Sequence, residues 1–184
     1  IDSSLDIRYG NPLVIYKELL KEYNIKKVFT NHDYEPYAKQ RDSEILQLLN
    51  EHGVSFHTYK DQVIFEKDEV LKDDGKPYTI FTPYSRKWKA ALKEYHLKAY
   101  PVKKYLANFF KQPGKKIISL EEMGFAPAGL PFPGKEWMGQ VIRHYKEQRD
   151  IPSVEGTSRL SVHLRFGTIS IRSLAAEAGA LNET

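Results

Sequence analysis

The first sixty residues alternate between the apolar spacing of a helix and that of a strand. Asn11 and Pro12 are typical of a helix start, because Asn caps well and Pro fits the first helical position. Residues 27–31 and 54–59 predict short strands, and Pro36 predicts the start of a second helix between them. The apolar residues at helical spacing are Leu13, Tyr16, Leu20 and Tyr23 in the first helix and Ala38, Ile45, Leu48 and Leu49 in the second.

Alternation of helices and strands with short links is the element order typical of a parallel α/β sheet. The predicted fold class is therefore an α/β domain with a Rossmann-like parallel sheet. Two strands give too little sheet for two helices to cover, so we expect this sheet to be incomplete and further residues to precede Ile1.

The later part of the chain predicts extended, linker and helical segments in turn. Residues 76–84 predict a short extended piece, and residues 126–134, with three prolines and two glycines, predict an ordered linker. Helical spacing returns from Lys135, with Trp137, Val141, Ile142 and Tyr145 on one side. We expect three parts: residues 1–85 in the α/β domain, 86–130 as a basic, partly helical interdomain linker, and 131–184 as the start of a helical domain.

Charge and composition narrow the function classes. The net charge is +4, but residues 86–116 hold ten Lys and Arg residues and one acid, Glu94, with six aromatic residues among them. Such a segment either attracts a polyanion or is a solvated helical face over buried aromatics. The absence of cysteine excludes disulfides and thiolate chemistry and favours the cytoplasm. The apolar runs are far shorter than the about 20 residues of a membrane helix.

A dense cluster of hydroxyl groups and one arginine follows Gly156. Thr157 or Ser158 is predicted to cap a helix there, and Ser170 a second one, with Ile171, Leu174, Ala175 and Ala178 on one stripe. Hydroxyl donors, a guanidinium and unpaired amides at a helix start together suit a phosphate group. The alternative is ordinary capping with a surface arginine. The glycine patterns of dinucleotide and triphosphate sites are absent.

Four stretches, in order, resemble the DNA photolyase and cryptochrome family. They are "NHDYEPYAKQRD", "GKPYTIFTPYSRKWKA", "RDIPSVEGTSRLSVHLRFGTISIR", and Tyr145 twelve residues before Thr157. The likeness covers nearly the whole chain, is most specific in the third stretch, and is strongest to class I cyclobutane pyrimidine dimer photolyases. It implies an N-terminal α/β domain, a long linker and an all-helical FAD-binding domain, of which this chain holds only the beginning.

The resemblance also implies roles for individual residues. In the family, a short run of residues binds the diphosphate and ribityl part of FAD. It corresponds here to Thr157, Ser158, Arg159, Leu160 and Ser161. Tyr145 matches an aromatic residue that packs against the same cofactor, and Arg149 matches a residue that contacts DNA phosphate. The implied reaction is light-driven repair of cyclobutane pyrimidine dimers in UV-damaged DNA by an electron from reduced FAD, without a general base or nucleophile.

Several alternatives stay open. A cryptochrome would share the fold and flavin but sense light without repair, and a non-catalytic nucleotide-binding module would leave the 156–172 stretch unexplained. Preference for cyclobutane over (6-4) lesions is not fixed. The family's isoalloxazine pocket and tryptophan relay match nothing in this chain, so we expect a fragment that is inactive alone. We expect a monomer that acts on DNA, without membrane or metal.

A second, light-harvesting chromophore is implied near "NHDYEPYAKQRD". The candidate antenna residues are Asp33, Glu35 and Tyr37, while Arg41 and Asp42 suit a structural ion pair. Folate-binding members carry an Asn-Glu pair where this chain has Tyr37 and Ala38, which favours a deazaflavin or flavin antenna over folate. The six histidines lack metal-ligand spacing, and His163 is predicted to be a hydrogen-bonded structural residue.

Overall fold

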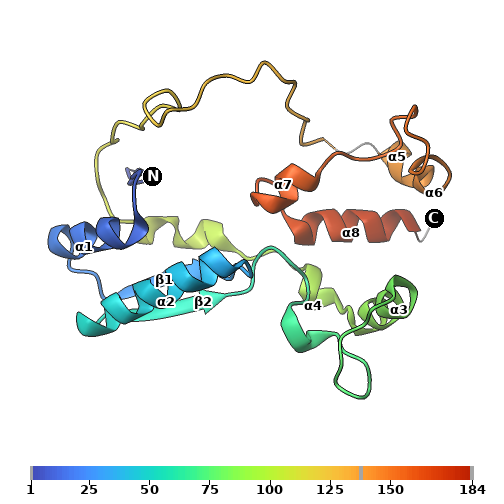
Figure 1. Cartoon of the computed structure of the whole chain (residues 1–184), viewed down its shortest axis with the longest axis horizontal. Coiled ribbons are helices and arrows are strands. Elements are labelled where there is room, and N and C mark those ends of the chain that lie inside the picture. The colour runs from blue at the N-terminus through green and yellow to red at the C-terminus, as the bar shows by residue number, and fades with distance from the viewer. Residues whose placement is uncertain (1, 137–138, 183–184) are drawn as a thin grey trace. The chain divides into compact units, whose positions relative to one another are not determined.

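The chain forms two compact units, and neither is a continuous segment. In the computed structural model, which describes residues 2–136 and 139–182, unit 1 comprises Ile1–Lys60 and Pro101–Leu130. Unit 2 comprises Asp61–Tyr100 and Pro131–Thr184. Figure 1 shows the order of their helices and strands along the chain. The division of the chain into domains at residues 85 and 130 stays a prediction.

Unit 1 contains a two-stranded parallel sheet with two helices. In chain order its elements are α1 (Pro12–Glu22), β1 (Lys27–Asn31), α2 (Pro36–Glu51) and β2 (Ser55–Tyr59). The strands run parallel and in register from Lys27 opposite Ser55 to Asn31 opposite Tyr59. The predicted α/β class, element order and parallel pairing are therefore confirmed, with boundaries that differ by two residues or fewer.

Local sequence explains where these helices begin. The side chain of Asn11 accepts hydrogen bonds from the amides of Leu13 and Val14, which have no partner inside the helix. Pro36 occupies the first position of α2, where a missing amide hydrogen costs nothing. Both predicted helix starts are confirmed.

The core of unit 1 lies between the helices and one face of the sheet. Its buried members are Ile45, Leu49 and Val54, and Val28 and Phe56 pack against them from adjacent strand positions. Val28 and Phe56 face one another in the register, so this sheet face is the one that the helices cover. All four residues predicted for the buried face of α2 are buried: Ala38, Ile45, Leu48 and Leu49.

The other sheet face carries stacked aromatic rings. Phe29 stacks on His57 at 5.2 Å and on Tyr59 at 6.2 Å between ring centroids. These residues alternate along the strands with Val28 and Phe56, so their side chains lie on the face away from the helical core. Phe29 remains 62% exposed. One face of this sheet is therefore covered by helices, and the other leaves aromatic side chains exposed.

The N-terminal segment of unit 1 is fastened to residues 110–123. The amide of Gln112 donates to the carbonyl of Asp2, its side chain donates to the carbonyl of Ser4, and Tyr9 donates to the carbonyl of Met123. Asp6 accepts from Arg8, Tyr23 and Lys115 at 2.7–3.0 Å. The only regular element in this returning segment is the 3-10 helix η2 (Val102–Asn108) among the described residues.

The first part of unit 2 is built from short helices around a partly buried aromatic group. Its elements are η1 (Lys67–Glu69), α3 (Phe81–Ala91) and α4 (Glu94–Leu97). The ring of Phe65 meets Trp88 edge-on at 5.5 Å and His96 at 4.7 Å. The prediction that residues 76–84 are extended is wrong from Phe81 onward, because Pro83 lies in the first turn of α3, where no amide is needed.

The second part of unit 2 is also helical, in four pieces. They are α5 (Gly139–Arg143), α6 (Tyr145–Gln148), α7 (Ser161–Arg165) and α8 (Ile171–Asn182). The hydroxyl of Ser170 accepts from the amide of Ser173, so the predicted cap of α8 is confirmed. Of the stripe predicted after Lys135, Trp137 lies outside the described residues, while Val141 is buried. None of the described helices is long and apolar enough to cross a membrane.

Candidate cofactor-binding site

The turn that carries the hydroxyl cluster is anchored to the end of α6 by Gly156. A Cβ at Gly156 would lie 2.6 Å from the Cβ of Gln148, 2.8 Å from its carbonyl carbon and 2.9 Å from its carbonyl oxygen. Since two of these atoms belong to the backbone, only glycine allows this approach. Gly156 thereby brings residues 157–161 next to the helix that holds Tyr145, the other residue predicted to contact FAD.

The hydroxyl groups of the turn are open to solvent. Thr157, Ser158 and Ser161 are all exposed. Within residues 2–136 and 139–182, the structure gives none of these three hydroxyls a hydrogen-bond partner. They are therefore available as donors to an anion.

The prediction that Thr157 or Ser158 caps a helix is wrong. α7 begins at Ser161, is five residues long, and its N-cap residue is Leu160, which makes no side-chain cap. The chain stays non-helical for longer because Leu160 turns inward and is only 2% exposed. An anion here would be held by hydroxyls and a guanidinium on a turn, because so short a helix contributes little dipole.

Arg159 has a strained backbone and an ionic partner. Its φ is +52°, in the left-handed region that residues with a Cβ seldom adopt. Its Nη2 donates to Oε1 of Glu155 at 2.8 Å, and the two side chains are 64% and 80% exposed. Strain of this kind is frequent at ligand-binding positions. The sequence-based prediction missed Glu155, although an acid four residues before an arginine is a recognisable charge pattern.

His163 holds the far end of the same turn in place. It is 2% exposed, its Nε2 lies 2.8 Å from the carbonyl oxygen of Pro133, and its Nδ1 lies 2.7 Å from Oγ1 of Thr168. The carbonyl can only accept, so Nε2 carries a proton and, in a neutral ring, the Thr168 hydroxyl donates to Nδ1. The ring of Phe132 also meets it edge-on at 5.3 Å. The predicted structural role of His163 is confirmed.

Tyr145 and Arg149 lie one helical turn apart at α6. The guanidinium of Arg149 lies 5.6 Å from the ring centroid of Tyr145, and its Nε lies 3.5 Å from Oδ2 of Asp150. Tyr145 is 44% exposed, so one part of its ring is free to pack against a ligand. The residues predicted to bind FAD and the residue predicted to bind DNA therefore lie either at α6 or on the turn that Gly156 holds against Gln148 of this helix.

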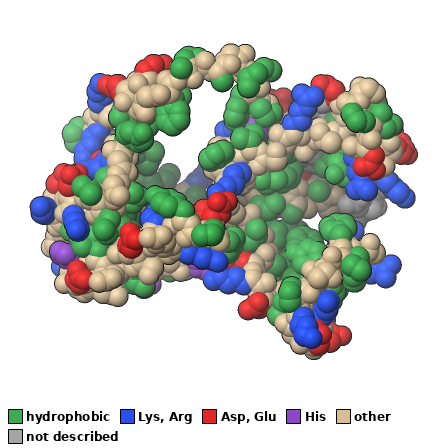
Figure 2. Space-filling view, in the orientation of Figure 1, with side chains coloured by type: hydrophobic (Ala, Val, Ile, Leu, Met, Phe, Trp, Pro, Cys, Tyr) green, Lys and Arg blue, Asp and Glu red, His purple; other side chains and the backbone are tan. Residues whose placement is uncertain are grey.

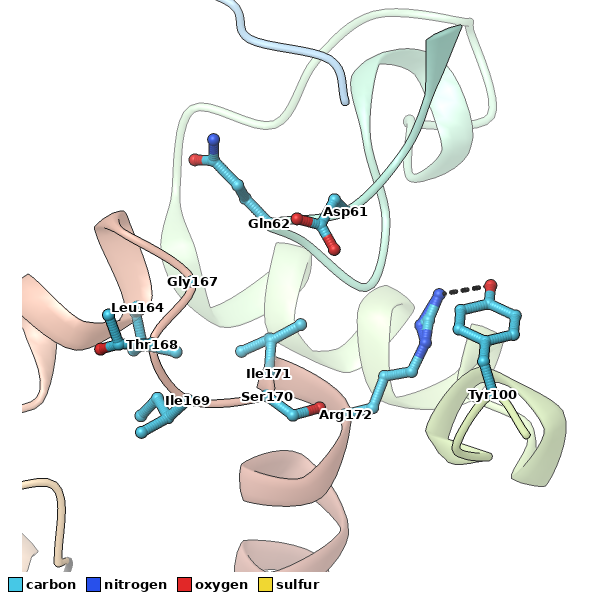
Figure 3. A pocket seen from close by; sticks show the side chains of 10 residues that line it. All are labelled: Asp61, Gln62, Tyr100, Leu164, Gly167, Thr168, Ile169, Ser170, Ile171 and Arg172. Atoms are coloured by element: carbon cyan, nitrogen blue, oxygen red, sulfur yellow. Dashed lines mark hydrogen bonds between the residues drawn. The ribbon is translucent and has the colours of Figure 1, made fainter. Parts of the chain in front are cut away.

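A cavity of about 270 Å³ lies where α7, the loop after it and α8 meet residues 61–62 and 100 (Figure 3). The guanidinium of Arg172 lies 4.7 Å from the ring centroid of Tyr100 and donates to its hydroxyl at 3.0 Å. Nearby, Arg165 donates to the side-chain oxygen of Gln62 at 3.2 Å. These contacts join segments far apart in sequence, and no sequence pattern predicted them.

The three antenna candidates differ in their surroundings. Tyr37 is 67% exposed and lines a cavity of about 220 Å³ together with Asn11 and Arg41. Asp33 accepts from the amide of Glu35 at 3.3 Å, which shapes the turn before α2. Arg41 donates to Asp42 at 2.7 Å, as expected of a structural ion pair. The antenna roles stay predictions. Among the described residues, no cluster of three His, Asp or Glu side chains has metal-binding geometry.

Comparison with known proteins identifies the family. The sequence profile described as DNA photolyase matches residues 1–104. A deoxyribodipyrimidine photo-lyase of Halobacterium salinarum is 30% identical over 98% of this chain, and cryptochrome-1 of Erithacus rubecula is 29% identical over 94%. The chain spans 40% of the length of the first and 32% of the second.

The fold agrees with a solved structure of the same kind. A bacterial class III photolyase from Agrobacterium tumefaciens superposes with a TM-score of 0.67 at 24% identity, over 90% of this chain and 37% of that one. The parallel sheet with flanking helices is the N-terminal α/β fold of photolyases. With the family profile matching more than half of its residues, this chain belongs to the DNA photolyase family.

Proposed function

We propose that the complete protein binds FAD and repairs cyclobutane pyrimidine dimers in DNA with light. The observation that supports this best is the turn at 157–161. Its exposed hydroxyls have no partner among the described residues, and Gly156 anchors it against Gln148 of α6, the helix that begins at Tyr145. A diphosphate needs several donors on a fixed backbone, and this turn supplies them. The donor set therefore fits the diphosphate of FAD.

The proposed contacts divide by chemistry. Thr157, Ser158 and Ser161 donate hydroxyl hydrogen bonds to the diphosphate and ribityl oxygens, and Arg159 supplies positive charge. Leu160, which is buried, contributes its backbone and fixes the turn. Tyr145 packs its exposed edge against the cofactor. Bound FAD supplies the photochemistry, while these residues bind and orient it.

DNA contact is proposed at Arg149 and along α3. Arg149 is half exposed. α3 contains no acid, leaves Tyr84 and Trp88 partly buried, and exposes Arg86 and Lys89. Figure 2 shows Lys and Arg side chains around α3 together with some Asp and Glu, and Lys87 of this helix pairs with Asp73 at 2.8 Å. Basic side chains with few acidic neighbours bind phosphate by releasing counterions. This surface suits a polyanion such as UV-damaged DNA.

A cryptochrome-type photoreceptor without repair activity is the second candidate. The observation that favours it is the similarity to cryptochrome-1 of Erithacus rubecula, which is nearly as high as that to the photolyase. A repair assay on the complete protein under blue light separates the two. Recovery of thymine from dimer-containing DNA supports the photolyase, and binding of FAD without recovery supports the photoreceptor.

The flavin role of the turn is tested by Arg159→Ala in the complete protein. We expect at least about tenfold weaker FAD binding, since charge-assisted hydrogen bonds to phosphate are strong. Circular dichroism should show an unchanged α/β domain. Undiminished flavin occupancy would contradict the phosphate role. A deazaflavin or flavin antenna at Asp33, Glu35 and Tyr37, a cytoplasmic location and a monomeric state stay predictions, which the absorption spectrum, cell fractionation and light scattering would test.

A further inference from the structure

We propose that Glu155 regulates retention of the flavin by competing with its diphosphate for the guanidinium of Arg159. This inference rests on the proposed FAD site. The carboxylate of Glu155 accepts from Nη2 of Arg159 at 2.8 Å. The group assigned to hold the cofactor's negative charge is therefore already occupied by a negative charge of the protein itself.

The turn imposes this pairing, because residues 155–159 are not helical. Gly156 is buried against the backbone of Gln148, which fixes the position of the chain between the two partners. Arg159 then adopts a left-handed backbone with φ of +52°. Both side chains are exposed, at 64% and 80%, so neither is confined by packing. The pair is set by the anchored turn and can open without unfolding anything around it.

Electrostatics give the direction of the effect. A diphosphate that approaches Arg159 has to replace Glu155 and then lies close to its carboxylate. Two like charges about 5 Å apart repel each other, and more strongly at a protein surface than in bulk water. An exposed ion pair contributes little to the stability of the protein, so it is readily exchanged for another ionic contact. Glu155 should therefore weaken flavin binding without preventing it.

The nearby carboxylates of Asp150 and Glu147 pair with other residues than Arg159. Asp150 lies near Arg149 at 3.5 Å, and Glu147 lies 3.4 Å from His144. Among the described residues, Glu155 is the carboxylate paired with Arg159. The charge balance at the proposed diphosphate site is therefore set by this one residue.

The test compares Glu155→Gln with Glu147→Gln in the complete protein. Both substitutions remove one exposed carboxylate from the same region, but Glu147 contacts His144 and not Arg159. The dissociation constant of FAD is measured by fluorescence titration of the flavin-free protein at low and high salt. We expect Glu155→Gln to bind FAD about three- to tenfold more tightly at low salt, with the gain shrinking at high salt, and Glu147→Gln to bind within about twofold of the parent.

A double-mutant cycle separates this inference from the proposed function. In the Arg159→Ala background, Glu155→Gln should tighten FAD binding less than in the parent, because the ion pair no longer exists and only the direct repulsion by the carboxylate is relieved. If Arg159→Ala weakens FAD binding but Glu155→Gln does not tighten it, the competition by Glu155 is wrong and the phosphate role of Arg159 stands. If Arg159→Ala binds FAD as tightly as the parent, the phosphate site itself is wrong.

Discussion

The guanidinium of Arg172 lies over the ring of Tyr100, 72 positions earlier in the chain, and donates a hydrogen bond to its hydroxyl. The two contacts fix the start of α8 against the segment that follows α4 (Figure 3). The first turn of α8 is thus held by Ser170 through a cap and by Arg172 through Tyr100.

A graded pair of substitutions at Tyr100 should separate its two contacts. Tyr100→Phe removes the hydrogen bond alone and should lower the free energy of unfolding by about 0.5–1 kcal/mol. Tyr100→Ala also removes the cation–π contact and should cost about 1–2 kcal/mol. Urea denaturation of the parent and both variants measures this. Equal losses for the two variants would show that the ring face contributes nothing.

Gly156→Ala should destabilise unit 2 because the new methyl group overlaps the backbone of Gln148. We expect a loss of about 1–3 kcal/mol in the free energy of unfolding, the usual cost of overpacking. Gly114→Ala is the matched control, since a Cβ there meets no atom within 4 Å and its φ is not in the left-handed region. Both are compared by thermal and urea denaturation. A loss at Gly114 as large as that at Gly156 would contradict the close-approach explanation.

His163→Ala should be among the more damaging single substitutions in unit 2. It leaves a cavity and deprives the carbonyl of Pro133 and the hydroxyl of Thr168 of their partner. Together these effects predict a loss of about 2–4 kcal/mol in urea denaturation. His144→Ala serves as control because the His144 side chain is 58% exposed. A similar loss in both variants would mean that the network around His163 adds nothing.

The stability of unit 1 should fall in acid because of Asp6. Hydrogen bonds from Arg8 and then Lys115 hold the pKa of the Asp6 carboxyl well below its usual range. A carboxyl whose pKa is lower when folded contributes stability above its unfolded pKa, near 3.9, and loses it as the pH falls further. The urea midpoint should therefore decline below about pH 4. Asp6→Asn should flatten this decline, and an unchanged pH dependence in that variant would exclude Asp6 as its source.

Arg149→Ala should weaken DNA binding equally for different sequences. If Arg149 contacts one phosphate, the slope of log affinity against log salt should become less negative by about one contact. Fluorescence anisotropy at several salt concentrations measures both quantities. Lys17→Ala, at an exposed basic residue of unit 1, controls for the loss of one positive charge. A salt slope identical to that of the parent would reject the contact.

Much of unit 1 follows from its sequence. Asn11 and Pro36 mark helix starts, and the helical spacing of Ile45, Leu48 and Leu49 identifies the buried face of α2. These signals are local, because a cap or a periodicity concerns residues within one or two turns of each other. For the same reason the cap of α8 by Ser170 was predictable.

The sequence by itself determined the element order and parallel sheet of unit 1, the family, and the cluster of hydroxyl donors after Gly156. It did not determine that α7 begins only at Ser161 or that α3 begins at Phe81, since burial of Leu160 and the tolerance for Pro83 in a first turn override local preference. Only the tertiary structure decided that Gly156 rests on Gln148 and that Arg172 reaches Tyr100. Such contacts depend on how closely separate segments approach in space, and one-dimensional spacing carries no record of that approach.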